Sequence, residues 1–369
     1  MISVPAAFAP TYARARTQFL EAAAMLGLPT QSFNHPLPGR DGEDLAMDIA
    51  LDGPPTADKL LVISSACHGV EGFCGSGVQV FALHDADWRD KARDAGVAVL
   101  YIHALNPHGF SHLRRVTHDN VDLNRNFVDF SQPLPANHDY ATLHPLMLPD
   151  DWPPTTKIIA ACEDYMRTHG DKAIQNIVTR GQYTHADGLF YGGVAPTWSN
   201  TTLRTVLQQY AQQARRIAWI DLHTGLGPRG MGERIYDGPN DHASYTRAQA
   251  WWGNAGNPSG ETPVTSVYDG SSTSAYLTGQ LWQAVQAECP QAQHAAITLE
   301  YGTEPLGNIM DALRADHWLH LHPQASATVH ATIKLQIRQA FYPDADDWKG
   351  MVISQARQAM FQAVDGLAT

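Results

Sequence analysis

The sequence predicts an α/β protein: a single domain with a mixed, mostly parallel twisted sheet and helices on both faces. The apolar runs Leu60–Ser65 and Val97–Ala104 indicate buried strands, and helical apolar spacing between residues 72 and 84 separates them. Two such strands joined through a helix are typical of a right-handed crossover in a parallel sheet. At 369 residues, with 44% hydrophobic and 17% charged residues, the chain can bury a large core.

Composition and charge exclude several classes of protein. The formal net charge is −12 and no run is rich in Lys or Arg, so we expect no nucleic-acid partner. No apolar stretch is long enough to span a bilayer, so we expect no membrane partner. Residues 1–20 lack the pattern of a secretory signal, which predicts a cytoplasmic protein. The four cysteines have no paired spacing, so we expect free, mostly buried thiols at Cys67, Cys74, Cys162 and Cys289.

The first third of the chain contains the remaining signals of the predicted sheet. Thr11–Leu26 has helical spacing, and Asp44–Leu51 alternates like a strand. The strand Val97–Ala104 breaks at the Asn-Pro-His-Gly-Phe segment of residues 106–110. Residues 114–127 are polar and aperiodic, so we expect a surface loop with a functional task. A solvated connector is the alternative.

The rest of the chain adds mainly helices. Phe130–Thr156 is rich in Pro and His and predicts an irregular excursion. The periodicity predicts two strands, Ile217–Leu222 and Ala295–Leu299, and the following helices: Lys157–His169, Lys172–Arg180, Leu203–Arg215, Ala243–Trp252, Met310–Leu321, Ala327–Ala340 and Trp348–Ala363. We treat residues 1–369 as one catalytic domain, with extra C-terminal helices over about 326–369.

A turn carrying His68 and Glu71 follows the strand Leu60–Ser65. In an open α/β sheet, ligands bind outside the carboxyl ends of the strands. An imidazole and a carboxylate together suit a divalent metal of the zinc class. The alternative is a helix start with an acidic first turn, which needs no metal.

Two later strands deliver groups of the same kind. Ile217–Leu222 is followed by His223, and Ala295–Leu299 is followed by Glu300. Because the carboxyl ends of parallel strands lie on one edge of a sheet, these groups should converge with His68 and Glu71. That arrangement supplies three protein ligands, an open position for water and a separate Glu as base. Two nitrogens and one carboxylate around zinc form a frequent catalytic set for peptide hydrolysis.

With these residues in place, the chain resembles the zinc carboxypeptidase, or funnelin, family. His68 and Glu71 match its HxxE ligand pair, residues 106–110 its NPDGF turn with His108 in place of Asp, and residues 121–127 its VDLNRNF loop. His223 matches the third ligand, and Glu300 in ITLEYGT matches the general base. The resemblance spans roughly residues 60–303. It is nearest to a bacterial branch known mainly as a domain of unknown function, which shares GQYTHADGLFYGG and the segment Pro196–Ser199.

The resemblance implies a role for each matching residue. His68, Glu71 and His223 would bind one Zn²⁺ per chain, and Glu300 would act as general base on the metal-activated water. Arg115 would polarise the scissile carbonyl, with Arg114 as its competitor. Asn124 and Arg125 would bind the free carboxylate of the substrate. Tyr268 is the best match to the family's mobile tyrosine.

The implied function is a zinc metallopeptidase that cleaves an amide or peptide bond next to a free carboxylate. The first alternative is an N-acyl amino acid deacylase of the aspartoacylase and succinylglutamate desuccinylase type. The second is a binding module that has lost catalysis, against which Glu300 argues, since a binder needs no general base. The substrate would be a small peptide or an N-acyl amino acid. The sequence leaves its side chain and the oligomeric state open.

Other candidate residues have two readings. Asp221 precedes His223 by two positions, so it faces the same side of its strand; it supports the metal ligand or is simply a buried, hydrogen-bonded Asp. His103, His108, His112 and His118 lie close in sequence but lack ligand spacing with a partner, so we expect structural or solvated roles.

Overall fold

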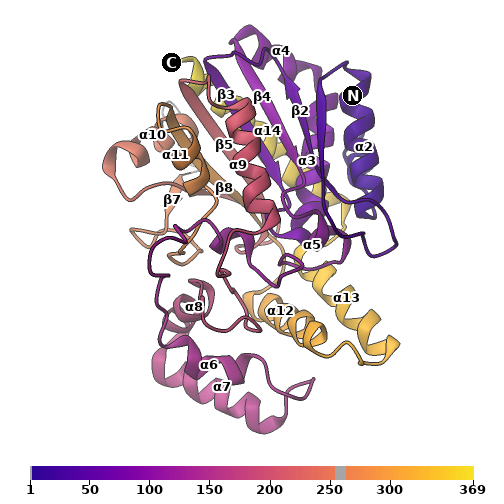
Figure 1. Cartoon of the computed structure of the whole chain (residues 1–369), viewed down its shortest axis with the longest axis vertical. Coiled ribbons are helices and arrows are strands. Elements are labelled where there is room, and N and C mark those ends of the chain that lie inside the picture. Colours follow the sequence, from indigo (N-terminus) through magenta and orange to yellow (C-terminus); the bar gives the residue numbers. More distant parts are fainter. Residues whose placement is uncertain (1, 254–262) are drawn as a thin grey trace.

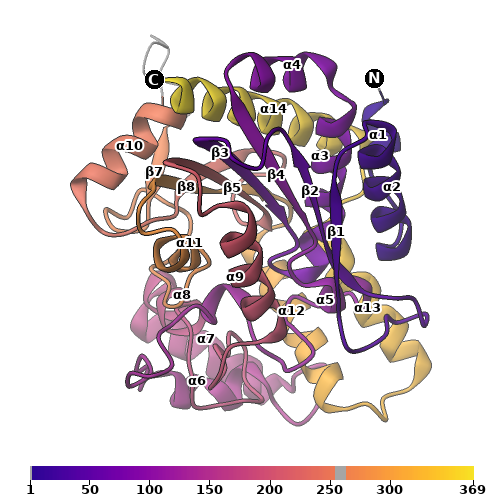
Figure 2. The same ribbon diagram turned by 45° about the horizontal axis from the view of Figure 1, so that its top comes forward.

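The computed structural model describes residues 2–253 and 263–369. Its described strands form one sheet of eight, in the order β1-β2-β4-β3-β5-β8-β6-β7. They are β1 Thr30–Asn34, β2 Ala46–Asp52, β3 Lys59–Ser65, β4 Val97–His103, β5 Arg216–Gly225, β6 Gly232–Tyr236, β7 Val264–Ser266 and β8 Gln293–Gly302. The sheet is visibly twisted (Figure 2).

Parallel pairing occupies the centre of the sheet. Strands β4, β3, β5 and β8 run parallel to one another, whereas β2 and β1 add antiparallel at one edge. At the other edge β6 is antiparallel to β8, and β7 is parallel to β6. The central strands are buried nearly throughout, which explains their continuous apolar runs. The predicted fold class, a mixed and mostly parallel sheet, is confirmed.

Helices cover both faces of this sheet. The described helices are α1 Val4–Ala7, α2 Tyr12–Met25, α3 Gly72–His84, α4 Ala86–Asp94, α5 Pro107–Ser111, α6 Tyr140–Met147, α7 Thr156–His169, α8 Asp171–Thr179, α9 Trp198–Tyr210, α10 His242–Trp252, α11 Gln283–Glu288, α12 Leu306–Leu321, α13 Ala327–Phe341 and α14 Asp346–Ala368. Two single 3₁₀ turns are η1 Gly69–Glu71 and η2 Leu123–Arg125.

Two apolar clusters hold these layers together. Side chains of α9 and α11 pack on one face of the sheet around Trp219. Side chains of α2, α3, α4 and α14 pack on the other face, around Phe73 and Trp88. Figure 1 shows α9 in front of the sheet and α14 behind it. Helices α6, α7, α8 and α12 lie beyond one end of the strands in both views (Figures 1 and 2).

Two expectations about individual segments were wrong, and three edge strands were missed. The stretch 130–156 is not wholly irregular, because it contains α6. The helix expected at Leu203–Arg215 is α9, Trp198–Tyr210, since Thr197 caps its start by accepting a hydrogen bond from the Asn200 amide. The short edge strands β1, β6 and β7 were not predicted. Strand β1 alternates between exposed and half-buried residues and carries one large apolar side chain, Phe33, so its pattern is weak.

The loop 114–127 is also not the surface loop that its polarity predicted. Most of its polar side chains are buried, and Asp122, Asn126 and Arg125 are 0%, 0% and 2% exposed. They are buried because they bond one another, the backbone and neighbouring segments. A polar sequence therefore forms part of the interior here, as a hydrogen-bonded network.

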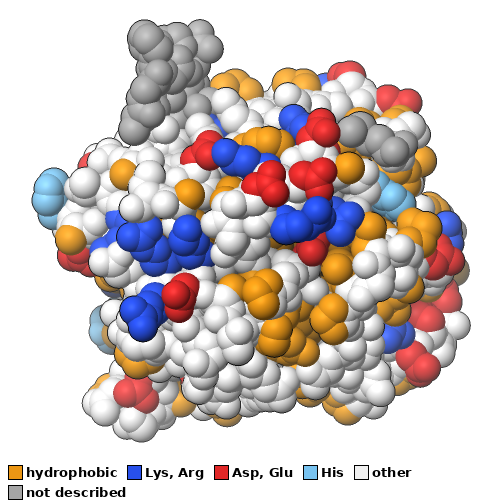
Figure 3. Space-filling model, turned by 90° about the horizontal axis from the view of Figure 1, so that it is seen from above, with side chains coloured by type: hydrophobic (Ala, Val, Ile, Leu, Met, Phe, Trp, Pro, Cys, Tyr) orange, Lys and Arg blue, Asp and Glu red, His pale blue; other side chains and the backbone are white. Residues whose placement is uncertain are grey.

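The outer surface shows charges of both signs. On the end of the molecule seen in Figure 3, Lys and Arg side chains lie interspersed with Asp and Glu. Lys91, for example, pairs with Asp365. In the described part of the chain, no helix is both long enough and apolar enough to cross a membrane.

Candidate metal centre

His68 and Glu71 stand where β3 ends. The turn η1 that carries them packs against the segment 109–115, whose Arg115 and Arg114 carbonyls accept hydrogen bonds from the amides of Gly69 and Val70. Gly69 permits this contact, because a Cβ at that position would lie 2.1 Å from the carbonyl carbon of Gly109. The Asn-Pro-His-Gly-Phe turn thus supports the turn that presents the two side chains.

His223 and Glu300 are register partners on the neighbouring parallel strands β5 and β8. Both side chains are buried, at 2% and 8% exposure. Directly paired residues of two adjacent strands point to the same face of a sheet. Pairing therefore places Glu300 beside His223, and three strand ends contribute to one site, as the sequence predicted.

Three candidate ligands converge at this site. His68 Nδ1 lies 2.9 Å from Glu71 Oε1, His223 Nδ1 lies 3.0 Å from Glu71 Oε2, and the two Nδ1 atoms are 3.2 Å apart. Ligand atoms at 2.0–2.1 Å from a tetrahedral Zn²⁺ would be spaced by about 3.3 Å. The donor set and its spacing fit a zinc ion, and His68, Glu71 and His223 form one of two candidate metal-binding groups among the described residues.

Each imidazole makes a second contact that orients it. His68 Nε2 lies 3.1 Å from Asp122 Oδ1, and His223 Nε2 lies 2.5 Å from Asp221 Oδ2. A proton on Nε2 that is donated to a carboxylate leaves the Nδ1 lone pair free for a metal. The sequence left the role of Asp221 open and indicated none for Asp122. Asp122 nevertheless lies in the VDLNRNF segment, residues 121–127, which is called the Asn-Arg loop below.

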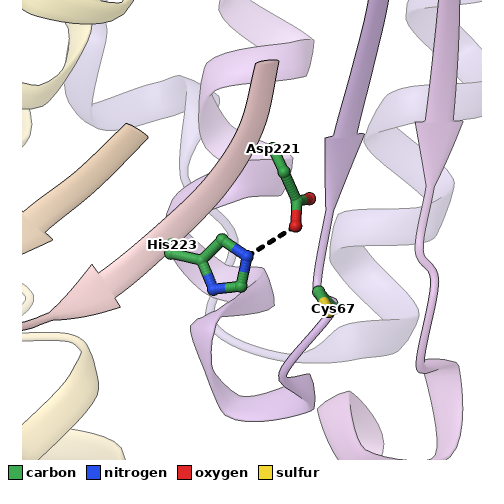
Figure 4. Close-up of side chains that lie close together, drawn as sticks. All are labelled: Cys67, Asp221 and His223. Atoms are coloured by element: carbon green, nitrogen blue, oxygen red, sulfur yellow. Dashed lines mark hydrogen bonds and ion pairs between the residues drawn. The ribbon is translucent and has the colours of Figure 1, made fainter. Parts of the chain in front are cut away.

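The second candidate group consists of Cys67, Asp221 and His223. Figure 4 shows Asp221 bonded to His223, with Cys67 beside the pair. Burial raises the pKa of Cys67 to about 12, so its sulfur is a protonated thiol near neutral pH. Asp221 Oδ1 also accepts a bond of 2.5 Å from Ser64. We therefore regard Cys67 and Asp221 as residues that hold His223 in place and not as ligands of a second metal ion.

Charges within the centre stabilise one another. Burial would raise the pKa of Glu71, but the adjacent His68 charge lowers it below its ordinary value. Burial would lower the pKa of His223, but Asp221 raises it well above the ordinary value. Burial would likewise raise the pKa of Asp122, but Arg115 and Arg125 bring it well below its usual range. Without a metal, these shifts favour the anionic forms of Glu71 and Asp122 and the cationic form of His223.

Glu300 differs from Glu71 in its surroundings. Its Oε1 accepts a hydrogen bond of 2.8 Å from the Leu226 amide. Burial, followed by the charge of Glu71, raises the pKa of Glu300 to about 8. The side chain lines the same cavity as the three candidate ligands but lies outside both candidate metal groups. A carboxyl that gains and loses a proton near neutral pH is suited to acid–base chemistry.

Arg115 points into this cavity and Arg114 does not line it. Arg115 donates to Asp122 Oδ2 at 3.0 Å and to Glu71 Oε1 at 3.3 Å, and its guanidinium lies 5.2 Å from the Phe190 ring centre. Arg114 bonds Asp316 at 3.1 Å.

Asn124 and Arg125 line the same cavity. Asn124 Oδ1 accepts a bond of 2.9 Å from the Leu281 amide. Arg125 donates from Nε and Nη2 to the Thr179 carbonyl, at 2.9 and 2.6 Å, and from Nη1 to the Asn124 carbonyl. These three bonds fix the guanidinium and leave two of its five N–H groups for a ligand.

Tyr268 is the one proposed site residue that the structure does not bring to this place. Its hydroxyl donates to the Gly238 carbonyl at 2.8 Å, and the side chain is absent from the lining of the described cavity. Its neighbour Val267 lines the cavity instead.

The cavity has a volume of about 90 Å³. Its charged lining consists of the residues already described: His68, Glu71, Arg115, Arg125, His223 and Glu300. The remainder of the lining is uncharged and consists of Asn124, Phe190, residues 224–226, Thr298, and residues of β6, α8, α12, α13 and the segment 267–280.

A model of the family described as "Protein of unknown function (DUF2817)" matches residues 8–355. The chain belongs to the DUF2817 family. The expected relation to a branch known mainly as a domain of unknown function is therefore confirmed. No curated protein matches the sequence.

Solved structures similar to this DUF2817 chain include thrombin activatable fibrinolysis inhibitor and proteins described as carboxypeptidases. Thrombin activatable fibrinolysis inhibitor has 11% identity and a TM-score of 0.48 over 90% of this chain and 77% of its own. Carboxypeptidase A from Helicoverpa armigera has 11% identity and a TM-score of 0.41, over 90% and 74%. A metallo-carboxypeptidase from Pseudomonas aeruginosa, in complex with (2-guanidinoethylmercapto)succinic acid, has 12% identity and a TM-score of 0.39, over 95% and 68%.

The GQYTHADGLFYGG segment of this DUF2817 chain packs around the Asn-Arg loop. Tyr183 donates to the Arg125 carbonyl at 2.7 Å, and the Tyr191 carbonyl accepts from the Asp122 amide at 2.8 Å. The ring centre of Phe190 lies 5.2 and 5.6 Å from the guanidinium carbons of Arg115 and Arg125, so one aromatic ring contacts both cations. The sequence alone indicates no role for this segment, because nothing local links it to residues 60 positions earlier.

Proposed function

We propose that the protein is a zinc-dependent hydrolase that cleaves an amide bond next to a free carboxylate, in the manner of a carboxypeptidase. One observation carries the proposal. A complete three-ligand set, a separate buried glutamate and two arginines line one small cavity. Each part of this set has a distinct task in amide hydrolysis. A purely structural site would not need the three ligands, the glutamate and the two arginines in one place.

His68, Glu71 and His223 would hold the zinc ion. When bound, Zn²⁺ supplies a Lewis acid that polarises a carbonyl and lowers the pKa of a coordinated water to about 7. Asp122 and Asp221 would keep the two imidazoles in the tautomer that this requires.

Glu300 would move the proton. As its carboxylate it takes a proton from water, whose oxygen bonds to the carbonyl carbon of the substrate. When the C–N bond breaks, Glu300 returns that proton to the nitrogen, which leaves as an amine. A bound cation would lower the pKa of Glu300 from about 8, so the carboxylate would be the resting form at neutral pH.

The two arginines would serve two different anions. Arg125, which lines the cavity with Asn124 and has two N–H groups without an acceptor among the described residues, would bind the permanent carboxylate of the substrate. Arg115 would donate to the carbonyl oxygen as negative charge develops on it. Arg114 does not compete for this task, because its guanidinium is engaged by Asp316 and Asn120.

Deacylation of an N-acyl amino acid remains the second candidate, because its substrate also carries a free carboxylate that Asn124 and Arg125 in the cavity lining could bind. A metal-free binding module is less favoured, because nothing in ligand binding alone requires Glu300 beside the three ligands.

A two-by-two comparison of kcat/KM tests the proposal. Zinc-loaded native protein and Arg125→Ala are each assayed with a substrate acid and its terminal amide. We expect the amide to be a poor substrate for the native enzyme. Arg125→Ala should have a raised KM for the acid and much less discrimination between the two, because it loses binding common to ground and transition states.

Arg125→Lys is the control for folding, since it keeps the charge but loses the planar fork. It should show an intermediate loss with an unchanged circular dichroism spectrum. Equal cleavage of acid and amide by the native enzyme would contradict carboxylate recognition and would favour an endopeptidase or a general amidase.

A further inference from the structure

The walls of the cavity limit the chemistry of its substrate. We propose that the amide accepted here joins an apolar, uncharged acyl group to an amino acid with an apolar side chain, an inference that rests on the function proposed above. Apart from the ligands, Glu300 and the two arginines, no charged side chain in the described part of the protein lines the cavity.

One apolar wall lies beside the base. The place that a Cβ on Gly225 would occupy is 3.4 Å from Glu300 Oε1 and 3.3 Å from Phe341 Cε1, and it is 3.7 Å from Ile309 Cδ1. Leu306, Met310 and Leu313 of α12 extend this wall. Thr224 ties it to β5 by donating to the Phe341 carbonyl at 2.6 Å.

The other apolar wall lies beside the carboxylate anchor. The Leu281 amide bonds Asn124, and the Gly279 carbonyl accepts from the Phe127 amide, so residues 277–281 run along the Asn-Arg loop. Leu277 from this segment, Val267 and Ile235 of β6 line the cavity there. Besides Asn124, the uncharged polar residues that line the cavity are Gln175, Thr179, Thr224, Ser274, Gln280 and Thr298.

These two walls give the substrate a direction. When Asn124 and Arg125 hold the carboxylate of the substrate's amino acid, the side chain of that amino acid lies against Leu277, Val267 and Ile235. The acyl group on the other side of the scissile amide then meets Phe341, Ile309 and Leu313. A charge on either group would lie against these apolar side chains with no oppositely charged partner among them, which is unfavourable. A free α-amine on the acyl side is one such charge, so unblocked dipeptides should be poor substrates.

Three N-acyl leucines with four-carbon acyl groups test the acyl side. Butanoyl-leucine, 2-aminobutanoyl-leucine and succinyl-leucine share the four-carbon length but carry a neutral, a cationic and an anionic acyl group, respectively. With zinc-loaded native protein we expect kcat/KM to fall by about 10- to 100-fold for each charged group. For the amino-acid side of the amide, kcat/KM for butanoyl-lysine and for butanoyl-aspartate should be lower than that for butanoyl-leucine by a similar factor.

Charge introduced into each wall should shift the preference towards the substrate of opposite charge. Leu277 is half-buried on a loop. Leu277→Asp should therefore raise the ratio of kcat/KM for butanoyl-lysine to kcat/KM for butanoyl-leucine by about tenfold or more, as expected for a new close charge pair. Leu277→Asn is the matched neutral control and should not. Met310→Glu should favour the 2-aminobutanoyl substrate in the same way, with Met310→Gln as its control.

The outcomes separate this inference from the proposed function. Cleavage of the whole set with a preference for a charged acyl group or side chain would overturn the apolar assignment and leave the hydrolase intact. Absence of cleavage of every substrate by zinc-loaded protein would overturn both. Equal responses of Leu277→Asp and Leu277→Asn would show that this wall does not contact the amino-acid side chain.

Discussion

Asp122 shows how much one side chain in the centre connects. Its Oδ1 meets His68 Nε2 at 3.1 Å and accepts from the Asn124 amide at 3.1 Å, while its Oδ2 accepts from Arg115 at 3.0 Å. One buried carboxylate thus contacts a candidate metal ligand, the start of the turn η2 and Arg115, the residue proposed to polarise the carbonyl. Its loss should affect metal binding as well as catalysis.

We predict that Asp122→Asn lowers zinc affinity by about 10- to 100-fold, as is usual when a carboxylate behind a ligating histidine is removed. Competition with a chromophoric chelator measures the dissociation constant. Asp119→Asn, in the same loop but 49% exposed, is the matched control and should bind zinc like the native protein. An affinity for Asp122→Asn equal to that of the control would show that His68 is oriented by other means.

Sequence reasoning reached the residues whose neighbours are local or follow a strand. His68 and Glu71 share one turn, and His223 and Glu300 end adjacent strands, so their convergence follows from the parallel sheet. Thr179 and Phe190 could not be found in this way. They reach Arg125 from segments more than 50 residues away in sequence, and only tertiary packing brings them there.

At the scale of elements, a buried ion cluster ties the loop 114–127 to helices α12 and α13. Asp316 of α12 accepts bonds of 3.1 Å from Arg114 and 2.6 Å from Lys334 of α13. Burial would raise the pKa of Asp316, but the charges of Lys334 and Arg114 lower it. Removal of this carboxylate would leave two cations facing each other in the interior.

Asp316→Asn should therefore lower the free energy of unfolding by about 3–5 kcal/mol, the usual cost of breaking a buried pair. Urea denaturation followed by circular dichroism measures the change. Asp311→Asn on the same helix removes a carboxylate that is 59% exposed and should cost less than about 1 kcal/mol. A loss for Asp316→Asn as small as that of the control would mean that the cluster does not anchor the two helices.

The long helices and buried strands were predicted, because their apolar periodicity is strong. The expected strands Leu60–Ser65 and Val97–Ala104 differ from β3 and β4 by one residue at one end. Errors fell where tertiary contacts override the local pattern. The loop 114–127 is polar yet buried, and its side chains are satisfied by residues 182–197, which no local pattern can reveal.

For the whole molecule, buried histidines link stability to pH. Burial lowers the pKa of His103 to about 4, and burial together with the charge of Arg114 lowers the pKa of His317 to about 3. In the unfolded chain both would titrate near 6.5. Above that pH both are neutral in either state. Below it the unfolded chain binds more protons, so stability falls as the pH falls towards about 4.

We predict that each of these histidines contributes a loss of roughly 1.4 kcal/mol per pH unit between about pH 6 and pH 4. The unfolding free energy of His317→Gln should therefore decline less steeply with falling pH than that of the native protein. His330→Gln changes an exposed histidine and should decline as the native protein does. Parallel pH curves for His317→Gln and His330→Gln would contradict the assignment.

The central claim is that His68, Glu71 and His223 hold one zinc ion and that Glu300, beside them, is a base and not a ligand. Zinc bound per chain after equilibrium dialysis, compared among native protein, His223→Ala and Glu300→Gln, tests it most directly. We expect about one ion, almost none and about one ion, respectively, for a single three-ligand site. Turnover by Glu300→Gln should meanwhile fall at least about 100-fold. Loss of zinc from Glu300→Gln, or full retention in His223→Ala, would contradict the claim.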